Sequence, residues 1–151
     1  TILYSNDIPV AGATVDYTED LDWSGVTGGT DAVNYKSFVN GLATADGVTG
    51  TITLYVPYRE GDDSVGICPG ATSLAEVTPT CTGLIGKEES DGDTELVTIN
   101  NVRYWKVTGL TGTGGFSGIG LAETGENIVP FVFTGLLMLF VPTLIYSRKR
   151  I

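Results

Sequence analysis

Apolar and polar side chains alternate along much of residues 1–119, with the period of two that is typical of half-buried β-strands. The clearest example is the segment 51–58 (TITLYVPY), in which every second residue from Ile52 to Tyr58 is apolar. These side chains share one face of an extended chain, so the segment is predicted to be a strand. Pro57 favours an edge position for this strand, because proline has no N–H to donate to a neighbouring strand.

Six further segments are predicted to be strands. Residues 95–99 and 102–108 are predicted to form a hairpin, because Asn100 and Asn101 between them tolerate the positive φ angles of a tight turn. The remaining strand candidates are residues 1–4, 13–17, 32–40 and 116–119.

Glycine-rich stretches such as SGVTGGT, ADGVTG and TGLTGTGG separate these segments and have the composition of turns. About seven short strands in residues 1–119 predict an all-β domain, a β-sandwich with Greek-key connections. Trp23 and Trp105 are predicted to fill its core or rim, with stacking on carbohydrate as the alternative. One short helix is predicted from Ser73, because Ser73 and Glu76 have the spacing of a capping box.

The C-terminal part has a different pattern. Residues 128–146 (IVPFVFTGLLMLFVPTLIY) contain no charge, and a mostly apolar run of 19 residues at about 1.5 Å each can cross a hydrocarbon core of about 30 Å. The basic residues Arg148, Lys149 and Arg150 follow at once, in a tail of residues 147–151. The positive-inside rule therefore predicts a single-pass type I membrane protein with a cytoplasmic tail and an extracellular sandwich. A buried core helix is the alternative.

The charge is divided unequally between these parts. All 18 acidic residues lie in residues 1–127, which hold only five of the eight basic residues. An acidic surface repels phosphate backbones, so no nucleic-acid partner is expected. The chain contains no histidine, which excludes Ser-His-Asp and Cys-His catalysis and every zinc site that needs histidine. No phosphate-binding glycine motif is present either, and the chain is not expected to be an enzyme.

Cys68 and Cys81 are predicted to form a disulfide, because an extracellular location favours oxidation of two nearby thiols. Asp91, Asp93 and Glu95 are the candidate ligands for a calcium ion, since alternating carboxylates in a glycine turn supply the hard oxygens that Ca²⁺ prefers. Their spacing does not match an EF-hand, and a solvated acidic loop is the alternative. No other cofactor is expected.

A pentapeptide stands before the apolar segment, in the linker of residues 120–127: Leu121, Ala122, Glu123, Thr124 and Gly125. Followed by the apolar span and the basic tail, it resembles the cell-wall sorting signal of sortase substrates, whose usual pentapeptide is Leu-Pro-x-Thr-Gly. The resemblance implies that a membrane cysteine transpeptidase cuts the bond between Thr124 and Gly125 and transfers the Thr124 carboxyl to a cell-surface amine. It therefore implies a sortase as a partner and the cell wall as a further location.

These features favour a membrane-anchored cell-surface protein with a structural or adhesive role, as a component of a surface layer, a filament or an adhesin. Its expected partners are the lipid bilayer and other surface proteins or copies of itself. The alternative is a single-span accessory subunit of a larger membrane complex, whose helix packs permanently against partner helices.

Overall fold

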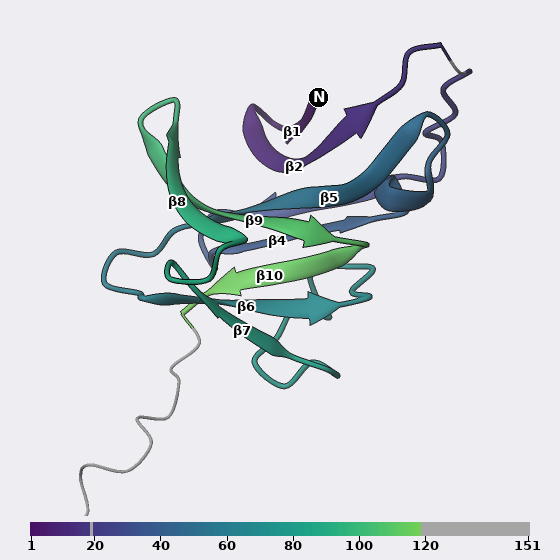
Figure 1. The fold of residues 1–151 in the computed structure, drawn as a ribbon. Coiled ribbons are helices and arrows are strands. Elements are labelled where there is room, and N and C mark those ends of the chain that lie inside the picture. The colour runs from purple at the N-terminus through teal and green to yellow at the C-terminus, as the bar shows by residue number, and fades with distance from the viewer. Residues whose placement is uncertain (19, 119–151) are drawn as a thin grey trace, which may run out of the picture. The chain divides into compact units, whose positions relative to one another are not determined.

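The computed structural model describes residues 1–18 and 20–118, which form an all-β fold (Figure 1). Ten strands and one short 3₁₀ turn are found in these residues. The strands are β1 (Ile2–Ser5), β2 (Ile8–Val15), β3 (Thr27–Asp31), β4 (Lys36–Asn40), β5 (Val48–Pro57), β6 (Ser64–Pro69), β7 (Ile85–Glu88), β8 (Thr94–Ile99), β9 (Val102–Leu110) and β10 (Thr113–Ser117). The 3₁₀ turn, η1, spans Leu42–Thr44.

The strands form two antiparallel sheets of five strands each. Sheet A has the order β1-β2-β5-β9-β8, and sheet B has the order β3-β4-β10-β6-β7. Four pairs of consecutive strands are hairpins within one sheet, and each of the other connections carries the chain across to the opposite sheet. The last strand, β10, is therefore the central strand of sheet B, paired with β4 on one side and β6 on the other.

The main core lies between the two sheets and is made of alternate residues from facing strands. Leu54 and Val56 of β5, Trp105 and Val107 of β9, and Ile67 of β6 are at most 1% exposed. Gly115 of β10 brings the sheets together, since a Cβ at that position would lie 2.8 Å from Val56 Cγ2. Burial of this single contiguous cluster supplies the main driving force for folding.

Two of the predicted elements are confirmed in detail. The segment 51–58 falls within β5 apart from its last residue, and the hairpin of residues 95–108 is formed by β8 and β9. Asn100 and Asn101 have φ angles of 51° and 64°, as a tight turn between two strands requires. The edge position expected from Pro57 is wrong, because β5 pairs with both β2 and β9. Pro57 is the last residue of the strand, so its missing N–H interrupts the pairing only at its end.

The first half of the predicted strand 32–40 is also wrong. Residues 32–35 form the turn between β3 and β4, in which Val33 is 84% exposed and Tyr35 has a φ of 54°. Asp31 fixes this turn, because its carboxylate accepts hydrogen bonds of 3.0 Å from the backbone N–H groups of Val33 and Asn34. Local hydrogen bonding thus overrides the apolar pattern.

The predicted helix after Ser73 is a single turn in the structure. The side chain of Glu76 accepts hydrogen bonds from Thr72, at 2.8 Å from the backbone nitrogen and 3.1 Å from the hydroxyl, instead of closing a capping box on Ser73. Three strands, β3, β6 and β7, were not predicted, because their glycines and the short length of β7 conceal the alternation.

Within residues 1–18 and 20–118, no helix is long and apolar enough to cross a membrane. The predicted span of residues 128–146 lies outside the described residues. The same is true of the pentapeptide Leu121–Gly125 and of the basic residues Arg148–Arg150.

Candidate functional site

The outer side of sheet B is covered by a loop that the disulfide holds in place. We call this loop, residues 70–84 between β6 and β7, the disulfide cap. The predicted bond between Cys68 and Cys81 is present, with a Cα–Cα distance of 5.8 Å. It joins the end of β6 to the far part of the cap, and a closed loop of this size stabilises a fold by about 3 kcal/mol on the chain-entropy account.

The cap packs onto β10 where the strand has glycine. Val77 is fully buried, and a Cβ on Gly114 would lie 2.2 Å from Val77 Cγ2 and 3.2 Å from Ala71 Cβ. Phe116 and Cys68 complete this second apolar cluster. Gly114 faces the cap and Gly115 faces the main core, so β10 is buried on both sides.

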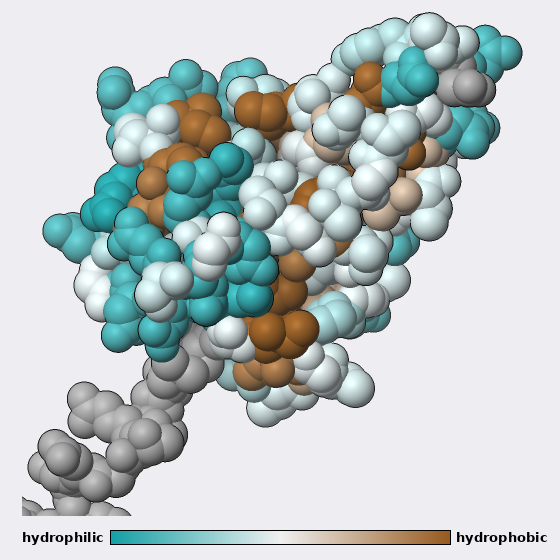
Figure 2. All heavy atoms as spheres, viewed as in Figure 1, coloured by the Kyte–Doolittle hydropathy of each residue, from teal (hydrophilic) through white to brown (hydrophobic). Residues whose placement is uncertain are grey.

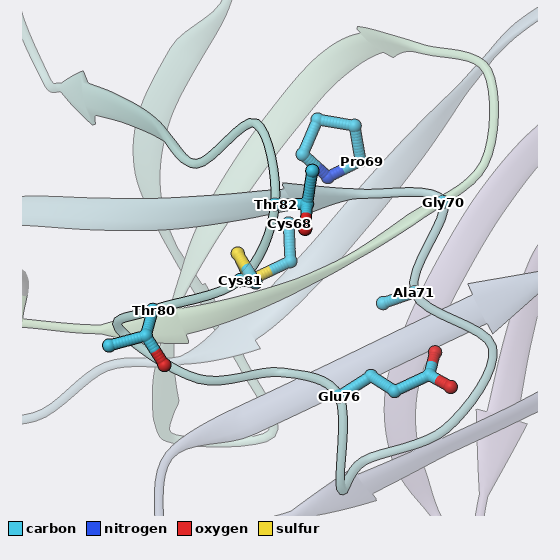
Figure 3. A pocket seen from close by; sticks show the side chains of 8 residues that line it. All are labelled: Cys68, Pro69, Gly70, Ala71, Glu76, Thr80, Cys81 and Thr82. Atoms are coloured by element: carbon cyan, nitrogen blue, oxygen red, sulfur yellow. A yellow bond between two sulfur atoms is a disulfide. The ribbon is translucent and has the colours of Figure 1, made fainter.

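A hollow of about 300 Å³ lies beside the disulfide (Figure 3). Its lining includes the two cysteines, Pro69, Ala71 and Glu76. The Glu76 carboxylate is already bonded to Thr72. Thr80 and Thr82 also line it, so the hollow offers small apolar groups, two threonine side chains and one carboxylate that is already bonded, which is a sparse set of groups for recognising a ligand.

The end of β10 is held in place by a network of hydrogen bonds between side chains. Ser117 Oγ accepts hydrogen bonds of 3.1 Å from Trp105 Nε1 and from the backbone N–H of Arg59, and it donates a bond of 3.0 Å to Asp62 Oδ2. Asp62 also receives two bonds of 2.9 Å from the Arg59 guanidinium, and this pairing raises the pKa of Arg59. Each buried polar group of the network is thereby satisfied.

The backbone and the neighbouring side chains favour glycine at the residue that follows β10. Gly118 has a φ of 75°, and a Cβ there would lie 2.3 Å from Arg59 Nη2 and 2.5 Å from Asp62 Oδ2. Its backbone N–H donates a bond of 3.0 Å to Ser64 O. The chain is thus held firmly at the last residue that the structure describes.

The three candidate calcium ligands each have a different protein partner. Asp91 accepts a bond of 3.0 Å from the backbone N–H of Glu88, Asp93 pairs with Lys87 at 2.9 Å, and Glu95 pairs with Lys106 at 2.6 Å. Among the described residues, no group of three or more acidic or cysteine side chains is arranged to hold a metal ion. The fold therefore does not bring these three carboxylates together.

The two tryptophans have different places. Trp105 is 1% exposed, which confirms its core position, and its ring packs edge-on against Tyr58 with 5.8 Å between ring centres. The guanidinium of Arg103 lies 4.2 Å from the centre of the Tyr58 ring on the outside. Trp23 is half-buried in a loop, where its indole donates a bond of 3.0 Å to Asp46 O.

The outer side of sheet A carries three tyrosines, Tyr4, Tyr55 and Tyr104, which the sequence pattern did not indicate as a group. Leu54 and Trp105 point into the core, so their neighbours Tyr55 and Tyr104 lie on the outer side of the sheet, where surrounding side chains leave them only 7% and 4% exposed. Tyr4 of β1 lies on the same side, and burial raises the pKa values of Tyr55 and Tyr104. The ion pair of Lys106 and Glu95 stands beside Tyr55. We call the outer side of sheet A, with these residues and Val102, the tyrosine face.

A signal for this face is present in the sequence but is ambiguous there. In segment 51–58 the alternation places Tyr55 on the face opposite to Leu54 and Val56, but only the pairing of β5 with β9 shows that Lys106 lies next to Tyr55 on that side. Comparison of the chain with protein-family models, with curated proteins and with solved structures finds no match.

Proposed function

We propose that this chain is a membrane-anchored cell-surface protein with a structural or adhesive role, whose sandwich is presented outside the cell by a C-terminal span. The observation that carries the proposal is the order of residues 121–151: a sorting-like pentapeptide, 19 uncharged residues and a basic stop. An uncharged segment of this length followed by a basic stop is typical of a membrane span and not of a soluble domain.

Two features of the fold support the proposal. The ten strands of the described residues lie within the unit Thr1–Gly120, and the last of them, β10, ends at Ser117. The disulfide between Cys68 and Cys81 suits an oxidising compartment outside the cytosol. In this arrangement the span is residues 128–146, the tail of Arg148–Arg150 is cytoplasmic, and the sandwich has Greek-key character.

The resemblance to sortase substrates implies that the chain is finally attached to the cell surface by a covalent bond. A sortase would cut between Thr124 and Gly125 and leave the sandwich attached through the Thr124 carboxyl. Leu121 and Thr124 would be its main recognition residues. Replacing Thr124 with Ala should abolish release of the C-terminal peptide in cells that have the enzyme, while the sandwich stays folded.

The membrane anchor is tested by fractionation of the full chain. Replacing Leu137 with Arg near the centre of the span should cost about 2.5–3.5 kcal/mol of insertion free energy. With Leu139→Asp added, the protein should leave the membrane fraction. A chain truncated after Gly125 should be soluble and β-structured by circular dichroism. If that shorter chain aggregates or stays unfolded, the apolar segment belongs to the core of the domain and the anchor proposal fails.

The alternative function, an accessory subunit of a membrane complex, differs in what accompanies the chain after mild detergent extraction. A fixed set of other proteins, present in constant proportion on sizing, would favour the alternative. A single chain, or an assembly made only of this chain, supports the proposed function.

A further inference from the structure

Exposed apolar side chains gather on the tyrosine face. Ile2 is 39% exposed, Tyr4 53% and Val102 49%, and all three point outward from sheet A. In Figure 2, brown side chains lie over the β8–β9 hairpin, the part of the sheet that includes Val102. Several exposed apolar side chains on one face of a sheet are typical of a surface that binds a partner, whereas single exposed apolar side chains are common on any protein.

The tyrosine face also lacks the negative charge that dominates the rest of the domain. The five strands of sheet A contain one acidic residue, Glu95, and two basic residues, Arg103 and Lys106. Of the acidic residues in positions 1–118, only Asp31, Glu88 and Glu95 lie in strands, and the others lie in loops and turns. Two copies of this acidic domain repel each other in most orientations, and face-to-face contact through sheet A avoids that repulsion.

The charges that remain on the face are self-complementary. Lys106 and Glu95 lie opposite each other on β9 and β8, with 2.6 Å between Nζ and Oε1. In a two-fold arrangement, the ammonium of one copy can approach the carboxylate of the other, while the exposed side chains of Tyr4 and Val102 contact the partner. We propose that the tyrosine face is a homophilic contact surface that pairs two copies of this chain.

The size of the face sets the expected strength of the contact. Five strands spaced about 4.8 Å apart and about 20 Å long give a footprint of roughly 400–500 Å² on each partner, which is at the weak end of specific interfaces. Pairing in solution should therefore be weak and reversible. This inference rests on the proposed function in one respect. Copies of the chain that are anchored on one surface have a high effective concentration, at which a weak interaction forms a substantial fraction of dimers.

Sedimentation of the full chain in detergent micelles tests the proposal. We expect a monomer–dimer equilibrium in the unmodified chain. Replacing Val102 with Asp should weaken dimerisation about tenfold or more, because a charge is then buried against an apolar partner. Val33→Asp is the matched control, since Val33 is more exposed and lies in the β3–β4 turn, and it should leave the equilibrium unchanged.

The ion pair allows a test that does not depend on the stability of either variant. Glu95→Lys gives a face with two positive charges, and Lys106→Glu gives a face with two negative charges. Each variant alone should be monomeric, whereas a mixture of the two should form heterodimers. A chain that is monomeric throughout, or dimers that survive Val102→Asp, would overturn the proposal. So would native material whose tyrosine face is bound to a different protein. None of these outcomes decides the membrane anchor, which the fractionation experiment tests separately.

Discussion

The methyl groups of Val77 rest directly on Gly114, at the place where the disulfide cap crosses the central strand of sheet B. A Cβ on Gly114 would lie 2.2 Å from Val77 Cγ2, a distance at which one of the two must move. This contact couples the cap to β10, which the core buries on its other side.

Replacing Gly114 with Ala should therefore destabilise the protein by about 1–3 kcal/mol, the usual cost of overpacking a closed core. Gly92→Ala is the control, since a Cβ there has no neighbour within 4 Å. Chemical denaturation of both variants measures the difference. Adding Val77→Ala to Gly114→Ala should make the double variant more stable than the sum of the single losses implies. Strict additivity would mean that the two side chains do not compete for the same space.

Reducing the disulfide should lower the free energy of unfolding by about 3 kcal/mol, because the ring that restricts the unfolded chain is opened. Cys68 and Cys81 should not react with a thiol reagent in the native protein until a reductant is added. Intact mass before and after alkylation measures both states. Rapid labelling of both cysteines without reductant would contradict the bond and weaken the extracellular assignment.

Replacing Asp62 with Ala should destabilise the domain by about 1–2 kcal/mol, since the hydroxyl of Ser117 loses its acceptor and Arg59 loses its ion pair. Asp63→Ala is the control, because Asp63 is an exposed neighbour of the same charge. Thermal unfolding should show the loss for Asp62 alone. Equal effects of the two substitutions would indicate a general charge effect in this loop.

The stability of the domain should fall in acid through the pair of Lys87 and Asp93. The hydrogen bond from Lys87 lowers the pKa of the Asp93 carboxyl. A carboxyl whose folded pKa lies below its unfolded value of about 3.9 stabilises the fold above that pH, and this contribution is lost as the pH falls through the folded pKa.

We therefore expect the melting temperature to decrease below about pH 4, and to decrease less steeply in Asp93→Asn. Glu89→Gln removes one charge from the same exposed turn without touching the pair, and it should keep the unmodified pH dependence. If the Asp93→Asn profile matches that of the unmodified protein, the pair does not contribute to acid stability.

The sequence by itself determined those elements that have one face in the core and the other face in contact with solvent or with polar groups. Alternation identified β5 because one of its faces is in the core, and two asparagines identified the β8–β9 turn because few other residues accept its positive φ angles. The pairing of Cys68 with Cys81 followed from there being only two cysteines. Each of these inferences depends on residues that are close together in the chain.

Only the tertiary structure revealed the strands that are buried on both faces and the contacts between residues that are distant in the sequence. In β10 (TGGFS) every residue is buried, so the sequence shows no alternation that would identify a strand. Its two glycines are typical of a turn, and only the packing of the cap on one side and the main core on the other explains them. Ser117 meets Asp62 across 55 positions because β10 ends beside the β5–β6 loop. Likewise, only the pairing of β5 with β9 and of β9 with β8 places Lys106 and Glu95 beside Tyr55 on one side of sheet A.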